Sequence, residues 1–163
     1  MKTKKEKIRL LLFDTYIATI KNGAGTKLFT QCFACIDGKK QNIAQGGELS
    51  CALFASSVLA MFNLVKSRHA TVEGMLRGMK ASGWKQIKKP KTGAVIVWDI
   101  SAESYGHKHI GFYIGNSKAI SNSTAQKAPA RHHWTFGTRG GKPKRRAQSI
   151  WWHKKLDIVD KLR

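Results

Sequence analysis

The sequence has few acidic residues, and this shortage is its most unusual feature. Only 9 Asp and Glu residues stand against 30 Lys and Arg, so the 163-residue chain has a formal net charge of +21. A strongly positive surface attracts polyanions and disfavours basic partners. Nucleic acid, an anionic membrane surface and a bacterial cell wall that bears anionic polymers all fit, and the charge alone does not choose among them.

Cysteine is also scarce. Three Cys is an odd number and far too few for a disulfide scaffold, so at least one thiol stays free unless two chains are cross-linked. Cys32 and Cys35 form a C-x-x-C pair, but the sequence has no second C-x-x-C or H-x-x-H pair to complete a four-ligand zinc site. Arg131-His132-His133-Trp134 has no partner at metal-binding spacing either. We therefore expect no metal.

No long hydrophobic run is present. A membrane-spanning helix needs roughly 20 apolar residues, and no segment approaches that length. The N-terminus begins like a secretory signal, basic and then apolar, but Asp14 interrupts the apolar stretch after four residues. We interpret this segment as a structural helix. The protein is then expected to be made in the cytoplasm, and to reach the cell wall, if it acts there, by another route.

The chain length and the 42% of apolar residues fit one globular domain, residues 1–163. Hydrophobic spacing and capping residues predict helices in the first half and strands in the second, with no linker between them. The segment 28–36 is too short to assign to a strand or a helix, and the basic segment 139–146 is expected to be a flexible loop. The predicted helices are 5–21, 50–62 and 71–82, and the predicted strands are 94–98, 109–115, 118–122 and 149–153. This order predicts an α+β domain.

Cys51 lies where a nearly all-apolar helix begins, with Ser50 as its expected N-cap. A helix N-terminus favours a thiolate, and a buried helix holds the sulfur in place. The other two thiols have no comparable position. Cys51 is therefore the candidate nucleophile, although many free cysteines are simply small buried side chains.

The run His109-Ile110-Gly111-Phe112-Tyr113-Ile114-Gly115-Asn116 closely resembles the His strand and turn of NlpC-type cysteine peptidases, which are papain-like relatives of the CHAP amidases. The segment 91–98 is similar to the strand that precedes the His strand in that family, and Ser50-Cys51-Ala52 occupies the place of its nucleophile motif. The resemblance covers roughly residues 45–125. It implies a papain-like fold with Cys51 as nucleophile and a third polar residue on the next strand that orients the His. His109 is expected to form a thiolate–imidazolium pair with Cys51 and later to protonate the leaving amine. His107 is the local rival to His109.

The third residue depends on strand register. If Asn116-Ser117 is a two-residue turn, Gly111 pairs with Asn122, whose amide oxygen can accept the imidazole N–H. If the connection is one residue longer, the parity changes and Ser121 is the neighbour. Ser121 is also the position that the resemblance implies, twelve residues after the His. We favour Asn122 and keep Ser121 open.

An oxyanion hole is expected to include the backbone N–H of Cys51 at the helix start. Gln45, six residues before Cys51, matches the place of the side-chain donor usual in papain-like enzymes. Tryptophans can line a groove for peptide or sugar, although each is more often a core residue. The candidates are Trp98, Trp134, Trp151 and Trp152, and we take Trp98 as the substrate-binding one.

The resemblance implies a cysteine amidohydrolase or endopeptidase that cleaves amide bonds in the stem peptides of bacterial peptidoglycan and needs no cofactor. The positive charge suits an anionic wall polymer as partner. Two alternatives stay open: a papain-like protein deamidase or isopeptidase, and a basic nucleic-acid-binding module on an inactive papain-like fold. The oligomeric state is not predicted.

Overall fold

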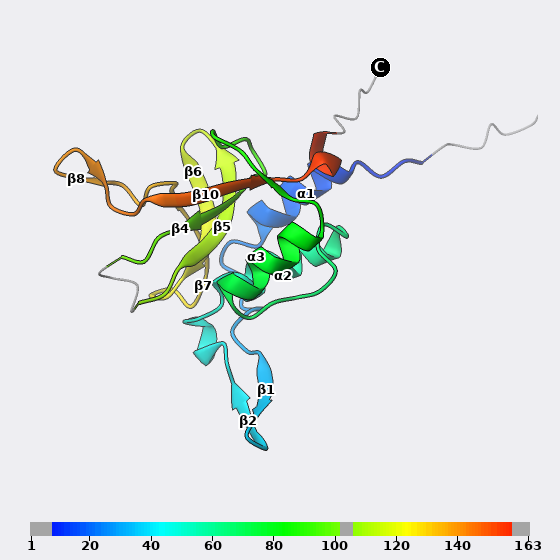
Figure 1. The fold of residues 1–163 in the computed structure, drawn as a ribbon, viewed down its shortest axis with the longest axis vertical. Helices are drawn as coiled ribbons and strands as arrows, with labels where there is room; N and C mark the ends of the chain where they lie inside the picture. Colours follow the sequence, from blue (N-terminus) through cyan, green and yellow to red (C-terminus); the bar gives the residue numbers. More distant parts are fainter. Residues whose placement is uncertain (1–7, 102–105, 158–163) are drawn as a thin grey trace, which may run out of the picture.

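A computed structural model describes residues 8–101 and 106–157 of the chain. This part has a mixed α+β fold in which three helices pack against an antiparallel sheet of six strands (Figure 1). The strand order in the sheet is β3-β10-β4-β5-β6-β7. Its strands are β3 (Lys85–Gln86), β4 (Val95–Trp98), β5 (His109–Gly115), β6 (Lys118–Ser123), β7 (Ala128–His133) and β10 (Ala147–Trp152).

The helices are α1 (Leu12–Asn22), α2 (Cys51–Met61) and α3 (Val72–Ala81), and short 3-10 turns occupy Gln45–Gly47 and Lys154–Asp157. Helix α2 is buried along most of its length, as its nearly continuous apolar sequence predicts. Its side chains form the centre of the main core together with the sheet. The fully buried Phe54 contacts Phe112 of β5 edge to face, and Tyr16 of α1 contacts the same ring.

The two predicted helix caps differ. Thr71 caps α3 as expected, because its Oγ1 accepts a hydrogen bond from the N–H of Gly74 at 3.1 Å. Ser50 stands at the N-cap position of α2, but its hydroxyl donates to the carbonyl oxygen of Phe29 instead. The first turn of α2, which begins at Cys51, therefore has no side-chain cap.

Helix α1 is shorter than the predicted helix 5–21. Residues 1–7 lie outside the described part, and helix begins only at Leu12. Ile8 is 86% exposed. The segment from Leu12 to Ile20 packs against the main core, and a helix without such packing gains little stability.

Segment 28–36, left open by the sequence, contributes strand β1 (Phe33–Ile36), which pairs with β2 (Lys39–Asn42) around the predicted turn Asp37-Gly38. The predicted loop 139–146 contains a small hairpin of β8 (Thr138–Arg139) and β9 (Lys142–Pro143). Strand β7 was missed because Pro129 stands inside it. Proline is tolerated there because β7 is an edge strand, and the outward side of Pro129 only accepts, from the N–H of Gly25, so no proline donor is needed.

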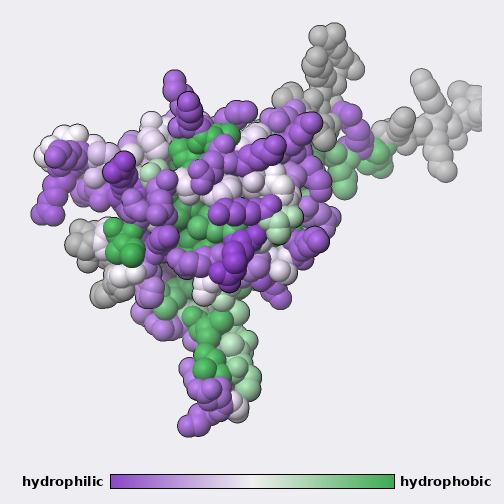
Figure 2. Space-filling view, viewed as in Figure 1, coloured by the Kyte–Doolittle hydropathy of each residue, from purple (hydrophilic) through white to green (hydrophobic). Residues whose placement is uncertain are grey.

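Most of the face in Figure 2 is hydrophilic, and apolar residues gather where the β1–β2 hairpin projects from the body of the protein. Phe33 and Ile36 of this hairpin are 55% and 41% exposed. Among the described residues, no helix combines the length and the hydrophobicity that a bilayer crossing demands.

Candidate active site

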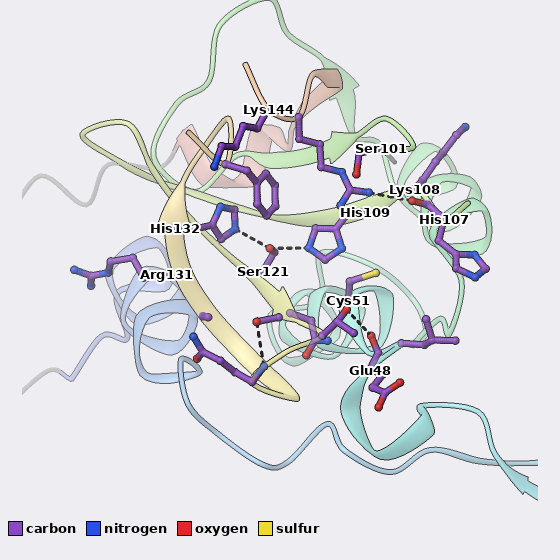
Figure 3. A pocket seen from close by; sticks show the side chains of 18 of the residues that line it. Glu48, Cys51, Ser101, His107, Lys108, His109, Ser121, Arg131, His132 and Lys144 are labelled. Atoms are coloured by element: carbon purple, nitrogen blue, oxygen red, sulfur yellow. Dashed lines mark hydrogen bonds between the residues drawn. The ribbon is translucent and has the colours of Figure 1, made fainter. Parts of the chain in front are cut away.

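A pocket of about 630 Å³ opens where the N-terminus of α2 meets the ends of β5, β6 and β7 (Figure 3). Cys51, His109, Ser121 and His132 all line it. These residues come from four different elements and are separated by up to 81 positions in the sequence (132 minus 51). The fold therefore brings together one thiol, two imidazoles and a hydroxyl.

Cys51 is the first residue of α2 and lies partly exposed at the pocket wall. Burial raises the pKa of its thiol above the ordinary value. Backbone N–H groups of Ile110, Ala52 and Cys51, and the positive charge of Arg145, lower this pKa but do not outweigh burial. The N–H groups at the start of α2 therefore favour the thiolate, as expected, but desolvation of the charged sulfur is the larger effect and the pKa is raised.

His109 begins β5, next to Trp98 of β4 in the register of the sheet. Burial, the positive charge of Arg145 and the nearby His132 lower its pKa to about 3, while the backbone of Asn122 acts in the opposite direction. The imidazole is therefore neutral near pH 7. A neutral thiol and a neutral imidazole line the same pocket, which favours general-base removal of the thiol proton over the thiolate–imidazolium pair that the resemblance implies.

Ser121, not Asn122, stands beside the His109 ring. The Nε2 atom of His109 and the Oγ atom of Ser121 are 2.8 Å apart and hydrogen-bonded. The two-residue turn at Asn116-Ser117 was predicted correctly, since Gly115 pairs with Lys118. A register shift between Tyr113 and Gly115 then inserts one extra residue, so Gly111 pairs with Ser121.

Because side chains alternate along a strand, that one-residue bulge reverses which residue of β6 shares a face with His109. The side chain of Asn122 lies on the other face and donates from Nδ2 to the carbonyl oxygen of Gly47 at 2.7 Å. Asn122 thus ties β6 to the segment just before Cys51. The prediction of Asn122 as the partner of His109 was wrong, and the open alternative, Ser121, takes that place.

Gly111 makes the approach of β5 to β6 possible. A Cβ atom at this position would lie 2.5 Å from both the carbonyl oxygen of Ile120 and the Cβ of Ser121. Neither atom is the end of a flexible side chain. The absence of a side chain at Gly111 is therefore required for Ser121 to sit against the His109 strand.

Trp98 does not line the pocket. It is completely buried, and its Nε1 donates to the carbonyl oxygen of Trp134 at 2.7 Å. Its ring packs beneath the site, with ring centroids 5.6 Å from His109 and 5.7 Å from His132. The prediction that Trp98 binds substrate was wrong, because the side chain has no free surface. It supports the two imidazoles from below.

His132 was missed as a site residue. Its Nε2 atom lies 2.7 Å from the Oγ atom of Ser121, opposite His109. It lies on β7, the strand that Pro129 concealed, and pairs with Ala119 of β6. Diagonal neighbours on one face of a sheet interact, and Ser121 and His132 are such a pair. Predicting His132 as a site residue would have required the correct register of β6 and β7.

The other predicted site residues lie at the pocket edge. Gln45 lines the pocket and has a φ of +49°, in the turn that Asn122 holds. Its role as an oxyanion donor stays a prediction. His107 is exposed and precedes β5, and Figure 3 shows its ring turned away from Ser121. This placement disfavours His107 as the rival base.

The pocket rim is basic. Lys108, Arg131, Lys144 and Arg145 line it, and the acidic residue in its lining, Glu48, forms an ion pair with Lys127 at 3.0 Å. Arg145 is held by the carbonyl oxygens of Asp99 and His107. A site with this charge favours substrates that carry carboxylate or phosphate groups.

Within the described residues, no cluster of three or more His, Cys, Asp or Glu side chains could hold a metal ion. Cys35 is part of β1 and Cys32 directly precedes that strand, so neither lies in the site, and all three cysteines are free thiols. The comparisons with known proteins add no assignment. No protein-family model matches the chain, and no curated protein sequence is significantly similar to it.

Proposed function

We propose that this protein is a cysteine amidohydrolase of the NlpC/CHAP type that cleaves amide bonds in peptidoglycan stem peptides. The observation that carries the proposal is the meeting of Cys51, His109 and Ser121 in one pocket. The support is that Cys51 begins a helix, His109 begins a strand, and the hydroxyl of Ser121 lies 2.8 Å from Nε2 of His109, groups that a papain-like mechanism would use.

In the first half-reaction, the thiol proton of Cys51 passes to His109 as the sulfur attacks the carbonyl carbon of the amide. The oxyanion that forms is stabilised by the backbone N–H of Cys51, in the uncapped first turn of α2, and by Gln45 as a second donor. The C–N bond then breaks, and His109 returns the proton to the leaving nitrogen. A thioester on Cys51 and a free amine result.

In the second half-reaction, His109 takes a proton from water, and the hydroxide attacks the thioester carbon. The C–S bond breaks, the carboxylic acid leaves, and the thiol of Cys51 regains its proton. Atoms and charge balance without any cofactor or oxidant. Ser121 holds the ring of His109 through both half-reactions.

The charge of the site supports a wall substrate. Stem peptides and wall polymers carry carboxylate and phosphate groups, and the basic rim formed by Lys108, Arg131, Lys144 and Arg145 lies around the reacting thiol. Electrostatic attraction of an insoluble anionic substrate raises the encounter rate and weakens with salt.

The test is to incubate the purified protein with insoluble peptidoglycan under reducing conditions and to follow released fragments by mass spectrometry. The wild type is expected to release peptides or amines. Cys51→Ala should lower the rate more than about a thousand-fold, whereas Cys35→Ala, which changes an exposed thiol outside the site, should leave it unchanged. The fragment masses name the bond.

If neither wild type nor variant releases fragments, the wall-hydrolase proposal is wrong. Salt-sensitive binding of nucleic acid that is equal for wild type and Cys51→Ala would then favour the nucleic-acid-binding module. Cleavage of a protein amide without cleavage of peptidoglycan would instead favour the deamidase or isopeptidase.

A further inference from the structure

Three hydrogen bonds run in series from His109 to the edge of the sheet. His109 Nε2 and Ser121 Oγ are 2.8 Å apart, Ser121 Oγ and His132 Nε2 are 2.7 Å apart, and His132 Nδ1 lies 2.8 Å from the carbonyl oxygen of His133. A hydroxyl and an imidazole nitrogen can each donate or accept, so the first two bonds have no direction of their own. The third has one, because a carbonyl oxygen only accepts.

The bond from His132 to the carbonyl oxygen of His133 is the fixed end of the series, and it determines which atom donates in the other two hydrogen bonds. Burial lowers the pKa of His132 as well as that of His109, so each ring is neutral and carries one N–H proton. The proton of His132 is on Nδ1, where it is donated to the carbonyl oxygen of His133. Its Nε2 atom then has a lone pair and accepts from the hydroxyl of Ser121. The Ser121 oxygen, having donated its proton, accepts from Nε2–H of His109.

We propose that His132 is a positioning residue that sets the tautomer of His109 through Ser121. With its proton held on Nε2, His109 keeps an unprotonated Nδ1, which is the atom available to take the proton of the Cys51 thiol. The inference rests on the proposed function of the Cys51–His109 pair and deepens it, by naming what determines the basic nitrogen. No proton moves along the series during the reaction; only the transfer between Cys51 and Nδ1 occurs.

The packing around His132 keeps its ring in one orientation. Phe136 stacks on it with ring centroids 4.0 Å apart and an angle of 20° between the planes. Trp98 contacts both imidazole rings, and Phe136 also contacts the His109 ring at 5.8 Å. A ring flip of His132 would break both of its hydrogen bonds within this aromatic layer.

One interaction favours the opposite arrangement. The backbone of Asn122 acts on the His109 ring and raises its pKa. A proton on Nδ1 of His109 would reverse the first two bonds of the series. It would also break the third, because His132 would then carry its proton on Nε2 and have none on Nδ1 for the carbonyl oxygen of His133. The effect of Asn122 is the smallest of the four influences on the pKa of His109, whereas the bond from His132 to the carbonyl oxygen of His133 is fully formed at 2.8 Å. The arrangement that keeps this bond, with the proton of His109 on Nε2, therefore has the better hydrogen bonds.

The direct test is NMR of the protein with ¹⁵N-labelled histidine near pH 7, because ring nitrogen shifts and couplings distinguish the two neutral tautomers. We expect Nδ1–H for His132 and Nε2–H for His109. After His132→Phe, the fixed end is lost and His109 should become a mixture of tautomers. His132→Gln, which can place an acceptor oxygen at the distance of Nε2, should restore Nε2–H on His109.

The matched control is His133→Gln. The His133 ring contacts Thr135 rather than Ser121, and its backbone carbonyl is unchanged by the substitution. It should leave both tautomers as in the wild type. Nδ1–H on His109 of the wild-type protein, or an unchanged tautomer after His132→Phe in a folded variant, would overturn the inference.

Kinetics test the same inference through Ser121. Alkylation of Cys51 by iodoacetamide reports base assistance without any substrate, and we expect His132→Phe to slow it roughly 10-fold, with a loss of about 10- to 100-fold in kcat on substrate. In the background of Ser121→Ala, His132→Phe should have no further effect. If the losses in rate from Ser121→Ala and His132→Phe were additive, His132 would not act on His109 through Ser121.

The two proposals can fail separately. If Cys51→Ala leaves hydrolysis unchanged, the proposed function is wrong, whatever the NMR result. If Cys51→Ala abolishes hydrolysis but His109 carries its proton on Nδ1, the hydrolase stands and the role of His132 is wrong.

Discussion

The two sides of the pocket contribute in different ways. The helix side supplies Cys51, on a rigid buried helix, but burial keeps its thiol protonated. The sheet side supplies an ordered series of hydrogen bonds from His109 to the edge strand β7. The difference indicates that the thiol of Cys51 depends on His109 to remove its proton. The orientation of His109 in turn depends on the register of β5 and β6, because that register places Ser121 beside its ring. Damage to the sheet side should therefore harm the chemistry even where Cys51 is untouched.

Among changes to the sheet side of the pocket, we expect Gly111→Ala to have the largest effect on hydrolysis and stability. The added Cβ would lie 2.5 Å from the carbonyl oxygen of Ile120 and the Cβ of Ser121, so β5 and β6 must separate. We expect a loss of roughly 1–3 kcal/mol in the free energy of unfolding, together with loss of nearly all hydrolysis. Urea unfolding and fragment release measure the two effects. A variant with wild-type stability and rate would show that the close approach is not needed.

A smaller and more selective effect separates the neighbours Ser121 and Asn122. Ser121→Ala removes the link to His109 and should lower kcat about 10- to 100-fold with little change in stability. Asn122→Ala leaves the Gly47 carbonyl oxygen without its donor and should cost roughly 1–3 kcal/mol of stability, because its bond holds the segment before Cys51.

Ser123→Ala is the matched control for both, since Ser123 is on the same strand and lines the same pocket, but its hydroxyl accepts from the N–H of Gln126. It should change neither kcat nor the unfolding free energy substantially. If Asn122→Ala lost kcat at unchanged stability while Ser121→Ala did not, the sheet register described above would be wrong for the active protein.

The smallest effect is a shift in the pH dependence of thiol alkylation. Burial raises the pKa of Cys51, so thiolate forms only at a pH above that of an unstructured cysteine, near 8.5. Alkylation of Cys51, followed by mass spectrometry, should therefore have its midpoint above that of a short unfolded cysteine peptide. A midpoint well below the peptide value would indicate a preformed thiolate–imidazolium pair and would contradict the protonated thiol described above.

Much of the local structure could be predicted from the sequence. A nearly continuous apolar run located α2, Thr71 marked the start of α3, and Asn116-Ser117 marked the hairpin between β5 and β6. The positions of Cys51 at a helix start and of His109 at a strand start follow from the same local signals. Such features depend on residues a few positions apart, and the sequence contains that information directly.

The partners of His109 were decided by the tertiary structure. A single-residue bulge between Tyr113 and Gly115 determines that Ser121 rather than Asn122 shares its face, and no local signal at Asn116-Ser117 reports the bulge. His132 is 11 residues from Ser121 in the sequence and enters the site only because β7 pairs with β6. The direction in which the pKa of the Cys51 thiol shifts likewise depends on how far the folded protein buries the sulfur. Register and burial are properties of the whole packed sheet, whereas helix starts and turns are properties of short segments.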